Sequence, residues 1–221
     1  MNQLSNMFVI SPHAAVCEIV NLTTLAAEKV TALKGYKKAR LQNKELEKSG
    51  IDCVVSVNVS GLQISDTKIV AIIKDALQNS GLAPNKLIIE ITESLVMEDL
   101  ERGLQVLEAI RDIGVSVSID DFGTGYSSLS YLKKSPISEL KIDQSFLRGF
   151  PANDEDTAIV RAIIALAHSL DLYVTAEGVE TQEQVNGLKN ISCELLQGYY
   201  FSKPLAFDDF KAYYLDYQVA H

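Results

Sequence analysis

The stretch "VSVSIDDFGTG", from Val115 to Gly125, decides the fold class. Apolar residues alternate with serine up to Ile119, and this period of two is typical of a strand. Asp120 and Asp121 follow side by side, and a Phe-Gly-Thr-Gly turn comes next. Adjacent carboxylates repel each other, so a pair at a strand end needs a cation or hydrogen-bond donors to hold it. The stretch therefore predicts a buried strand that ends in a charged site.

Strands and helices alternate on both sides of this stretch. The other predicted strands span residues 53–60, 86–94, 139–143, 173–180 and 193–201, and the predicted helices span 67–81, 98–114, 126–135, 156–172 and 181–190, with a last helix from about 207. Such alternation implies parallel strands joined by crossovers. We therefore predict an α/β fold, a TIM-like (β/α) barrel with about six of its eight strands visible. In such barrels the carboxyl ends of the strands carry the active site.

The N-terminal part of the chain has a different pattern. Residues 22–50 have mostly helical propensity, and we interpret their charge run as a solvated helix face. Before them only "MFVI", Met7 to Ile10, has the pattern of a strand. We expect one domain over residues 1–221, divided into a divergent N-terminal part (1–50), a motif-bearing barrel (51–205) and a C-terminal helix (206–221). The front of the barrel is expected to be incomplete.

Composition excludes several classes of protein. The sequence is 47% hydrophobic and 22% charged, as in folded globular proteins. Its formal charge of -9 argues against a surface for duplex nucleic acid. No apolar run reaches the length of about 18 residues that a membrane helix needs. Without a secretory signal pattern at the N-terminus, we expect a cytoplasmic protein. We interpret Cys17, Cys53 and Cys193 as reduced core thiols.

Polar residues stand at the predicted strand ends. They are Asn58, Glu90 with Glu93, Asp120 with Asp121, Lys141 with Asp143, Glu177 with Glu180, and Gln197. Each alone has a structural explanation, such as a turn cap, an ion pair or a lysine that reaches solvent. Together they form an oxygen-rich set, which hard cations such as Mg²⁺ or Mn²⁺ prefer. The three histidines lie outside these segments.

Two reactions remain open from the residues alone. Adjacent aspartates could flank two metal ions about 3.5 to 4 Å apart, as in phosphoryl transfer. Lys141 could then orient a water molecule and offset phosphate charge, while Glu177 binds a metal or accepts a proton. Metal-dependent phosphoester hydrolysis fits this set. An enolase-like barrel, which uses magnesium and a lysine base for proton abstraction, fits it as well.

The motifs resemble a known family. "SVNVS", "EITES", "SIDDFGTGYSSLSYL", "LKIDQSF", "AEGVET" and "LLQGYYFSKPL" occur in this order between residues 56 and 205. Together they closely resemble the EAL-domain family, bacterial phosphodiesterases that hydrolyse the second messenger cyclic di-GMP to linear pGpG. The resemblance implies a modified TIM barrel, usually dimeric, with magnesium or manganese at the strand ends.

The resemblance also implies roles for individual residues. The implied metal ligands are Asn58, Glu90, Asp120, Asp121 and Glu177, and Lys141 matches the lysine that contacts the catalytic water. Glu93 matches the glutamate that steadies the loop after the two aspartates. Asp143, Glu180 and Gln197 match positions that bind substrate or support the ligands.

One departure from the family pattern stands at the front. The Glu-Ala-Leu segment, whose glutamate binds metal, does not occur, and "ISPHAAVCEIV" (residues 10–20) resembles the region that normally follows it. This comparison places the missing glutamate before residue 1. We therefore expect one of two metal sites to be impaired and hydrolysis to be weak or absent, the alternative being an inactive cyclic di-GMP receptor or a protein-interaction domain. An open barrel is expected to dimerise, recruit a partner or be covered by the N-terminal helix.

Overall fold

A computed structural model describes most of the chain from residue 51 onward. The described residues are 7–10, 15–19, 51, 53–59, 64, 68–93, 100–124, 129–203 and 205–220. The charged helix expected within residues 22–50 lies outside them.

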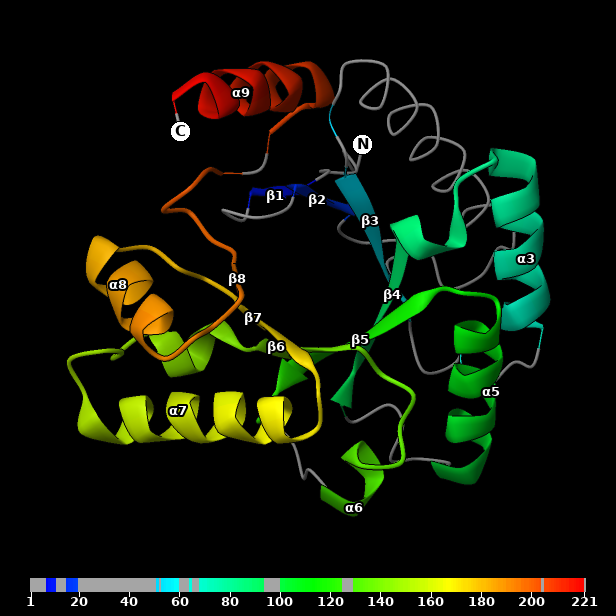
Figure 1. Cartoon of the computed structure of the whole chain (residues 1–221), viewed down its shortest axis with the longest axis horizontal. Helices are drawn as coiled ribbons and strands as arrows, with labels where there is room; N and C mark the ends of the chain where they lie inside the picture. The colour runs from blue at the N-terminus through cyan, green and yellow to red at the C-terminus, as the bar shows by residue number, and fades with distance from the viewer. Residues whose placement is uncertain are drawn as a thin grey trace, which may run out of the picture.

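One curled sheet forms the centre of the molecule (Figure 1). Its strands are β1 (Met7–Ile10), β2 (Ala15–Ile19), β3 (Cys53–Asn58), β4 (Leu87–Thr92), β5 (Ser116–Phe122), β6 (Glu139–Ile142), β7 (Tyr173–Ala176) and β8 (Leu195–Leu196). Their order in the sheet follows the sequence, with β1 antiparallel to β2 and every later neighbour parallel. The prediction of an α/β barrel is confirmed. Among the described residues no pairing joins β8 to β1, so the described part of the sheet is an open barrel.

The six strands predicted from residue 53 onward are β3 to β8, but the last two are shorter than predicted. After β7 and β8 the chain leaves the sheet, and Val179 N donates to Gln197 O at 2.9 Å. A β-carbon on Gly198 would lie 2.1 Å from Val179 O, so the two loops cross backbone to backbone. At the front, β1 matches the predicted strand. β2 was not predicted, because "AVCEI" lacks alternation and its strand state depends on pairing with β3.

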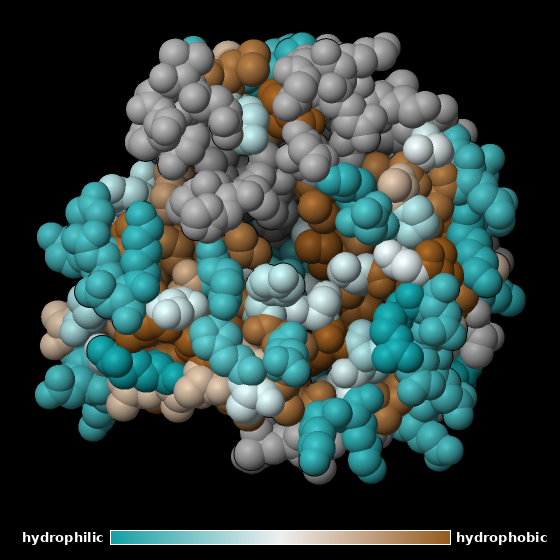
Figure 2. Space-filling model, in the orientation of Figure 1, coloured by the Kyte–Doolittle hydropathy of each residue, from teal (hydrophilic) through white to brown (hydrophobic). Residues whose placement is uncertain are grey.

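Helices surround the curled sheet (Figure 1). They are α3 (Ile69–Ser80), α5 (Leu100–Asp112), α6 (Leu129–Leu132), α7 (Asp154–Ser169), α8 (Gln182–Asn190) and α9 (Phe207–Ala220), with short 3-10 turns η1 (Pro84–Lys86) and η2 (Gln144–Leu147). Figure 2 shows hydrophilic residues over the outer helices and hydrophobic residues between them. None of the described helices combines the length and hydropathy needed to cross a bilayer.

Helix α7 shows how local sequence sets these elements. Asn153 caps its start by accepting a hydrogen bond from Asp156 N at 3.0 Å. Three acidic residues fill its first turn, where the helix dipole favours negative charge. Val160, Ile163, Ile164 and Ala167 form one buried stripe at helical spacing. The helix therefore packs this face against β6 and β7.

Alternation along the strands divides the sheet into two faces. The apolar positions are buried in the core under the helices: Ile89, Ile91, Val117, Ile119, Leu140, Ile142, Val174 and Ala176. The intervening positions, which lie on the opposite face, carry Glu90, Asp120 and Lys141. The outer face thus supplies the hydrophobic core, and the inner face is free for polar chemistry.

Candidate active site

The carboxyl ends of five neighbouring strands carry the polar side chains of the site. Asn58 ends β3, and Glu90 lies in register beside it on β4. Asp120 lies two register positions farther along on β5. Lys141 belongs to β6, and Glu177 directly follows β7. Because parallel strands end at one edge, residues far apart in the sequence meet in one place.

Lys141 lies at the centre of this group. Its Nζ is 2.6 Å from Glu177 Oε1, 3.1 Å from Glu90 Oε1 and 3.5 Å from Asp120 Oδ1. Asn58 Nδ2 donates to Glu90 Oε2 at 3.2 Å. The lysine side chain is only 3% exposed. One buried ammonium thus faces three carboxylates, and the group keeps a net negative charge that solvent screens poorly.

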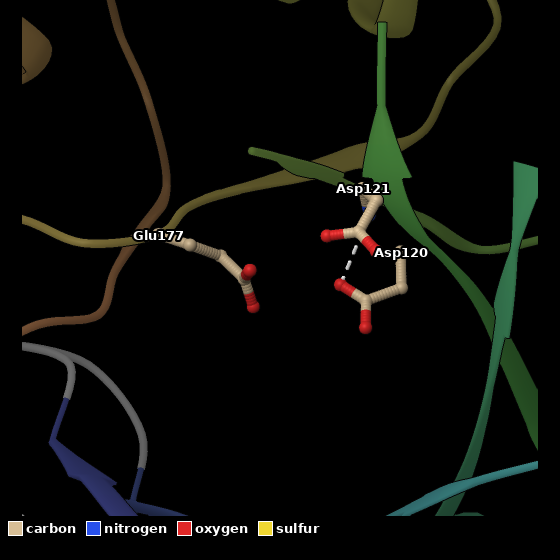
Figure 3. A group of neighbouring side chains, drawn as sticks. All are labelled: Asp120, Asp121 and Glu177. Atoms are coloured by element: carbon tan, nitrogen blue, oxygen red, sulfur yellow. Dashed lines mark hydrogen bonds between the residues drawn. The ribbon is translucent and has the colours of Figure 1, made fainter. Parts of the chain in front are cut away.

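Asp120, Asp121 and Glu177 form the acidic part of the site, and Figure 3 shows the glutamate pointing toward the aspartate pair from the opposite side. One carboxylate oxygen of each lies within 4.8 Å of the other two. Burial raises the pKa of Asp121, and repulsion by Asp120 and Asp143 adds to the rise, whereas Lys141 lowers it. Three converging carboxylates are therefore present where a cation would relieve their repulsion.

The backbone at Asp121 adopts an uncommon conformation. Its φ is 54°, in the left-handed region that few residues other than glycine adopt. Its N–H donates to Asp120 Oδ1 at 3.1 Å, which orients the first carboxylate. The sheet register also shifts between Ile119 and Phe122. This irregular strand end turns two adjacent aspartates toward one site, although neighbours on a regular strand point to opposite faces.

Glu93 supports the turn that follows the aspartates. Its Oε2 accepts a hydrogen bond from Gly123 N at 3.2 Å. Gly123 has a φ of 95°, and a β-carbon there would lie 2.9 Å from the Phe146 ring. The described part of the turn, up to residue 124, is thus fixed by the carboxylate of Glu93, directly after β4, and by the absence of a side chain at Gly123.

The remaining predicted site residues lie around the centre. Asp143 Oδ1 accepts from Ser145 N at 3.0 Å and caps η2. Glu180 is exposed, beyond Glu177 on the same loop. Gln197 is buried, and its N–H donates to Ala176 O at 2.8 Å. Asp143 is close enough to Asp121 to affect its pKa, whereas the described contacts of Glu180 are backbone contacts.

Sequence reasoning missed Gln184, a buried residue of α8. Its Oε1 accepts from Glu180 N at 2.7 Å and Thr181 N at 3.0 Å, and its Nε2 donates to Leu147 O at 2.6 Å. Thr181 Oγ1 accepts from Gln184 N in return, which completes a capping box. The spacing Thr-x-x-Gln at the start of α8 was the available signal. Gln184 ties the loop after β7 to η2.

The front of the sheet brings a further glutamate beside these strands. In the backbone register Glu18 of β2 pairs with Ser56 of β3, two residues before Asn58. Asn58 pairs with Glu90, and Asp120 again lies two positions farther along. This stagger is that of tilted strands in a barrel. The backbone of β2 therefore places Glu18 in the row that the site residues follow.

The donor set is suited to a hard divalent cation. Carboxylate and amide oxygens, without cysteine or histidine, are typical ligands of Mg²⁺, Mn²⁺ and Ca²⁺. The convergence of Asp120, Asp121 and Glu177 within 4.8 Å is compatible with such an ion. Lys141 beside them is suited to offset the charge of an anionic substrate.

Comparison with protein families gives one match over most of the chain. The sequence model of the EAL domain matches residues 19–204. The sequence is 45% identical over 166 residues to the "Cyclic di-GMP phosphodiesterase NbdA" of Pseudomonas aeruginosa, a match that covers 73% of this chain and 21% of that protein. The chain thus spans about a fifth of the length of the curated relatives it matches.

Solved structures share the fold. The structure described as "PaMucR Phosphodiesterase, c-di-GMP complex" superposes with a TM-score of 0.82 at 34% identity, covering 93% of this chain and 92% of that chain. A manganese and cyclic di-GMP complex of Klebsiella pneumoniae BlrP1 superposes with a TM-score of 0.76 at 26% identity, covering 92% of this chain and 56% of that chain. In both structures the fold is present together with cyclic di-GMP.

Proposed function

The chain belongs to the EAL domain family, and from this premise we propose that it hydrolyses cyclic di-GMP to linear pGpG with a divalent metal ion. The observation that carries the proposal is the group of three carboxylates around Lys141 at the strand ends. A protein that only binds partners has no physical need for a lysine buried among acids. Proton abstraction by an enolase-like barrel is the less favoured alternative, because the names of these relatives describe phosphodiesterases.

The chain's own residues divide the work of this reaction. Asn58, Glu90, Asp120, Asp121 and Glu177 would hold Mg²⁺ or Mn²⁺, which supplies a Lewis acid and lowers the pKa of water at the site. Lys141 would position the attacking water and offset charge on the phosphate. Glu177 would accept the proton of that water. Water adds to phosphorus, the bond from phosphorus to a 3′ oxygen breaks, and this oxygen takes up a proton to become a hydroxyl, so that the phosphate stays on the 5′ oxygen of pGpG.

The direct test is turnover by the purified chain. Cyclic di-GMP is incubated with Mg²⁺ or Mn²⁺, and pGpG is separated by chromatography. We expect product in both metals and none with a chelator. Glu177→Gln should lower kcat by at least about 100-fold, since it removes a proton acceptor and a candidate ligand. Glu194→Gln is the matched control and should retain the activity, because Glu194 precedes β8 and contacts β7 at Val174, at the end away from the site.

Binding measurements decide between enzyme and receptor. If the wild-type chain binds cyclic di-GMP by calorimetry but forms no pGpG with either metal, the receptor interpretation replaces the enzyme. Absence of binding with and without metal would leave a protein-interaction domain.

We also propose that residues 1–221 hydrolyse cyclic di-GMP more slowly than family members that carry the Glu-Ala-Leu segment. The glutamate of that segment binds metal directly, and without it the metal site is weaker, because residues that only support the ligands cannot take its place. The register of Glu18 makes this testable within the chain. Glu18→Gln should weaken Mn²⁺ binding if this residue supplies the front carboxylate. An unchanged Mn²⁺ affinity would show that the front ligand is lacking and would support the slow rate.

We propose that the open barrel is completed by a second copy or another partner. The order of the described strands leaves β1 and β8 at the edges of the sheet. Exposed edges of this kind favour association. Light scattering of the chain should report a dimer, and a stable monomer would contradict self-association. The cytoplasmic location stays a prediction from the sequence.

A further inference from the structure

A second polar layer lies inside the barrel, below the site. On β5, β6 and β7 the residue two positions before each site residue is polar: Ser118 precedes Asp120, Glu139 precedes Lys141, and Thr175 precedes Glu177. Residues two apart on a strand share a face, so these three lie on the inner face. They are 0%, 8% and 4% exposed. Barrel interiors are usually filled by branched aliphatic side chains, so a polar layer here calls for an explanation.

Glu139 is the centre of this layer. Thr175 Oγ1 donates a hydrogen bond to Glu139 Oε1. Ser118 Oγ is fully buried and makes no well-formed hydrogen bond to any described residue, yet it lies close enough to lower the pKa of Glu139. The carboxyl thus contacts side chains of the strands on both sides of β6. Each of these strands carries an acid of the site two residues farther on.

Burial of Glu139 favours its neutral form. Burial raises the pKa of Glu139 above its ordinary value, against the lowering effects of Thr175, Lys141 and Ser118. An ionised Glu139 would compete for Lys141, which already faces three carboxylates. A protonated carboxyl has one donor and keeps acceptor capacity, so it can accept from Thr175 and donate to Ser118. In this form it adds hydrogen bonds without adding charge.

We propose that Glu139 is a positioning residue that ties β5, β6 and β7 together through Ser118 and Thr175, and thereby holds Lys141 between Asp120 and Glu177. It touches neither substrate nor metal. The inference concerns the geometry of the site, and its relevance to catalysis rests on the proposed function. Without the tie, the three strand ends are free to shift relative to one another, and the ion pairs of Lys141 and the acidic group lose their spacing.

The test uses four variants at Glu139 and Thr175 and one control variant at Glu194, with measurements of Mn²⁺ binding, turnover and Tm. Mn²⁺ affinity is measured by electron paramagnetic resonance, and kcat and KM are measured with cyclic di-GMP. Glu139→Gln keeps one acceptor and one donor, so we expect Mn²⁺ affinity and kcat within about twofold of wild type. Glu139→Leu and Thr175→Val remove the tie and should weaken Mn²⁺ binding and lower kcat by about 10-fold or more, with KM unchanged. Glu139→Leu combined with Thr175→Val should be no worse than either alone, since both remove one tie.

Glu194→Leu is the matched control: it should make the protein less stable without moving Lys141 or the acidic residues of the site. Glu194 contacts β7 at Val174, next to Thr175, but at the end away from the site. We expect it to lower Tm while leaving Mn²⁺ affinity and kcat at their wild-type values. If Glu194→Leu and Glu139→Leu change these values equally, Glu139 is merely structural and the proposal is overturned.

Other results of the same measurements would also overturn the proposed role of Glu139. Equal losses in Glu139→Gln and Glu139→Leu would show that a charged carboxylate is required, and would overturn the neutral tie. If Glu139→Leu kept the Mn²⁺ affinity and kcat of the wild type, the proposed positioning role of Glu139 would also be overturned. If the wild-type chain binds Mn²⁺ but makes no pGpG, the proposed function fails, and the Mn²⁺ affinities of the same variants still judge the role of Glu139.

Discussion

A glutamate paired with a base lies at each end of β7: Glu194, which directly precedes β8, contacts the amino end, and Glu177 directly follows the carboxyl end. At the amino end Glu194 Oε1 lies 2.8 Å from His168 Nε2, and its Oε2 accepts from Val174 N at 3.0 Å. At the carboxyl end Glu177 lies 2.6 Å from Lys141. The first pair is 34% and 36% exposed, whereas Glu177 and Lys141 are 18% and 3% exposed.

The difference shows how one strand serves two purposes. At the amino end one acid meets one base and one backbone N–H, in contact with solvent, so its groups have complementary partners. At the carboxyl end three acids share one buried lysine, and Asp121 stands beside them. The excess of acid is unfavourable without a cation and becomes favourable when a cation binds. Four experiments can break or sharpen this comparison.

The largest effect is expected from Lys141→Met. The substitution leaves Glu90, Asp120 and Glu177 buried without their cation. We expect hydrolysis to be lost and the free energy of unfolding in metal-free buffer at pH 7 to fall by about 3 kcal/mol, as when one partner of a buried ion pair is removed. Urea denaturation measures this loss, which should shrink at lower pH as the carboxylates become protonated. An unchanged urea midpoint would contradict the central role of Lys141.

A smaller effect of opposite sign on stability is expected from Asp121→Asn. Burial and repulsion by Asp120 raise the pKa of Asp121, so its charge is unfavourable in the folded protein. Removing the charge should stabilise the metal-free protein by about 0.5 kcal/mol after screening by solvent. Mn²⁺ binding should weaken at the same time. A lower Tm in metal-free Asp121→Asn would show that the charge is not in excess.

The pH dependence of stability tests Glu139. The pKa of Glu139 is raised above its ordinary value of 4.5 in the folded protein. The contribution of the neutral carboxyl to the free energy of unfolding is therefore fully present below pH 4.5, and it is lost as pH rises through the raised pKa. Glu139→Gln does not titrate. The difference in Tm between Glu139→Gln and wild type should therefore shift in favour of the variant as pH rises from about 5 to about 9. Parallel curves over this range would mean that Glu139 does not change its charge there.

The smallest effect is expected from His168→Ala, in the last turn of α7 near the amino end of β7. Its pair with Glu194 is about one-third exposed on each side. Exposed pairs are worth up to about 1 kcal/mol, so urea denaturation should show a loss of about 0.5 kcal/mol. Hydrolysis and Mn²⁺ affinity should not change, since the pair lies at the end of the strand away from the site. A reduced kcat would break the contrast between the two ends.

Much of the architecture could be predicted because the signals are local. Alternating residues in β4 and β5, and the glycine that ends α3 in a left-handed conformation at Gly81, each specify an element by themselves. β2 was missed, since its strand state arises from pairing with β3, 38 residues away in the register Ala15 to Cys53. The lengths of β7 and β8 also depend on contacts between their loops, which no local pattern reveals.

The site shows the same division. The polar residues at strand ends could be named from the sequence, because parallel strands end together. Their distances to Lys141 depend on register, and the left-handed backbone at Asp121 is set by the irregular end of β5. Glu139 was overlooked beside Lys141, since a glutamate at the start of a short strand looks like a solvent-exposed residue until its burial is known.

The crossing of Gly198 over Val179 has a consequence for how this protein changes in evolution and in engineering. Because no side chain fits at Gly198, we expect the loops that follow β7 and β8 to be compatible only as a matched pair. A graft of only one loop from a relative would bring a backbone path shaped for a different partner. A transplant should therefore exchange both loops together and keep Glu177, Val179 and Gly198 in place.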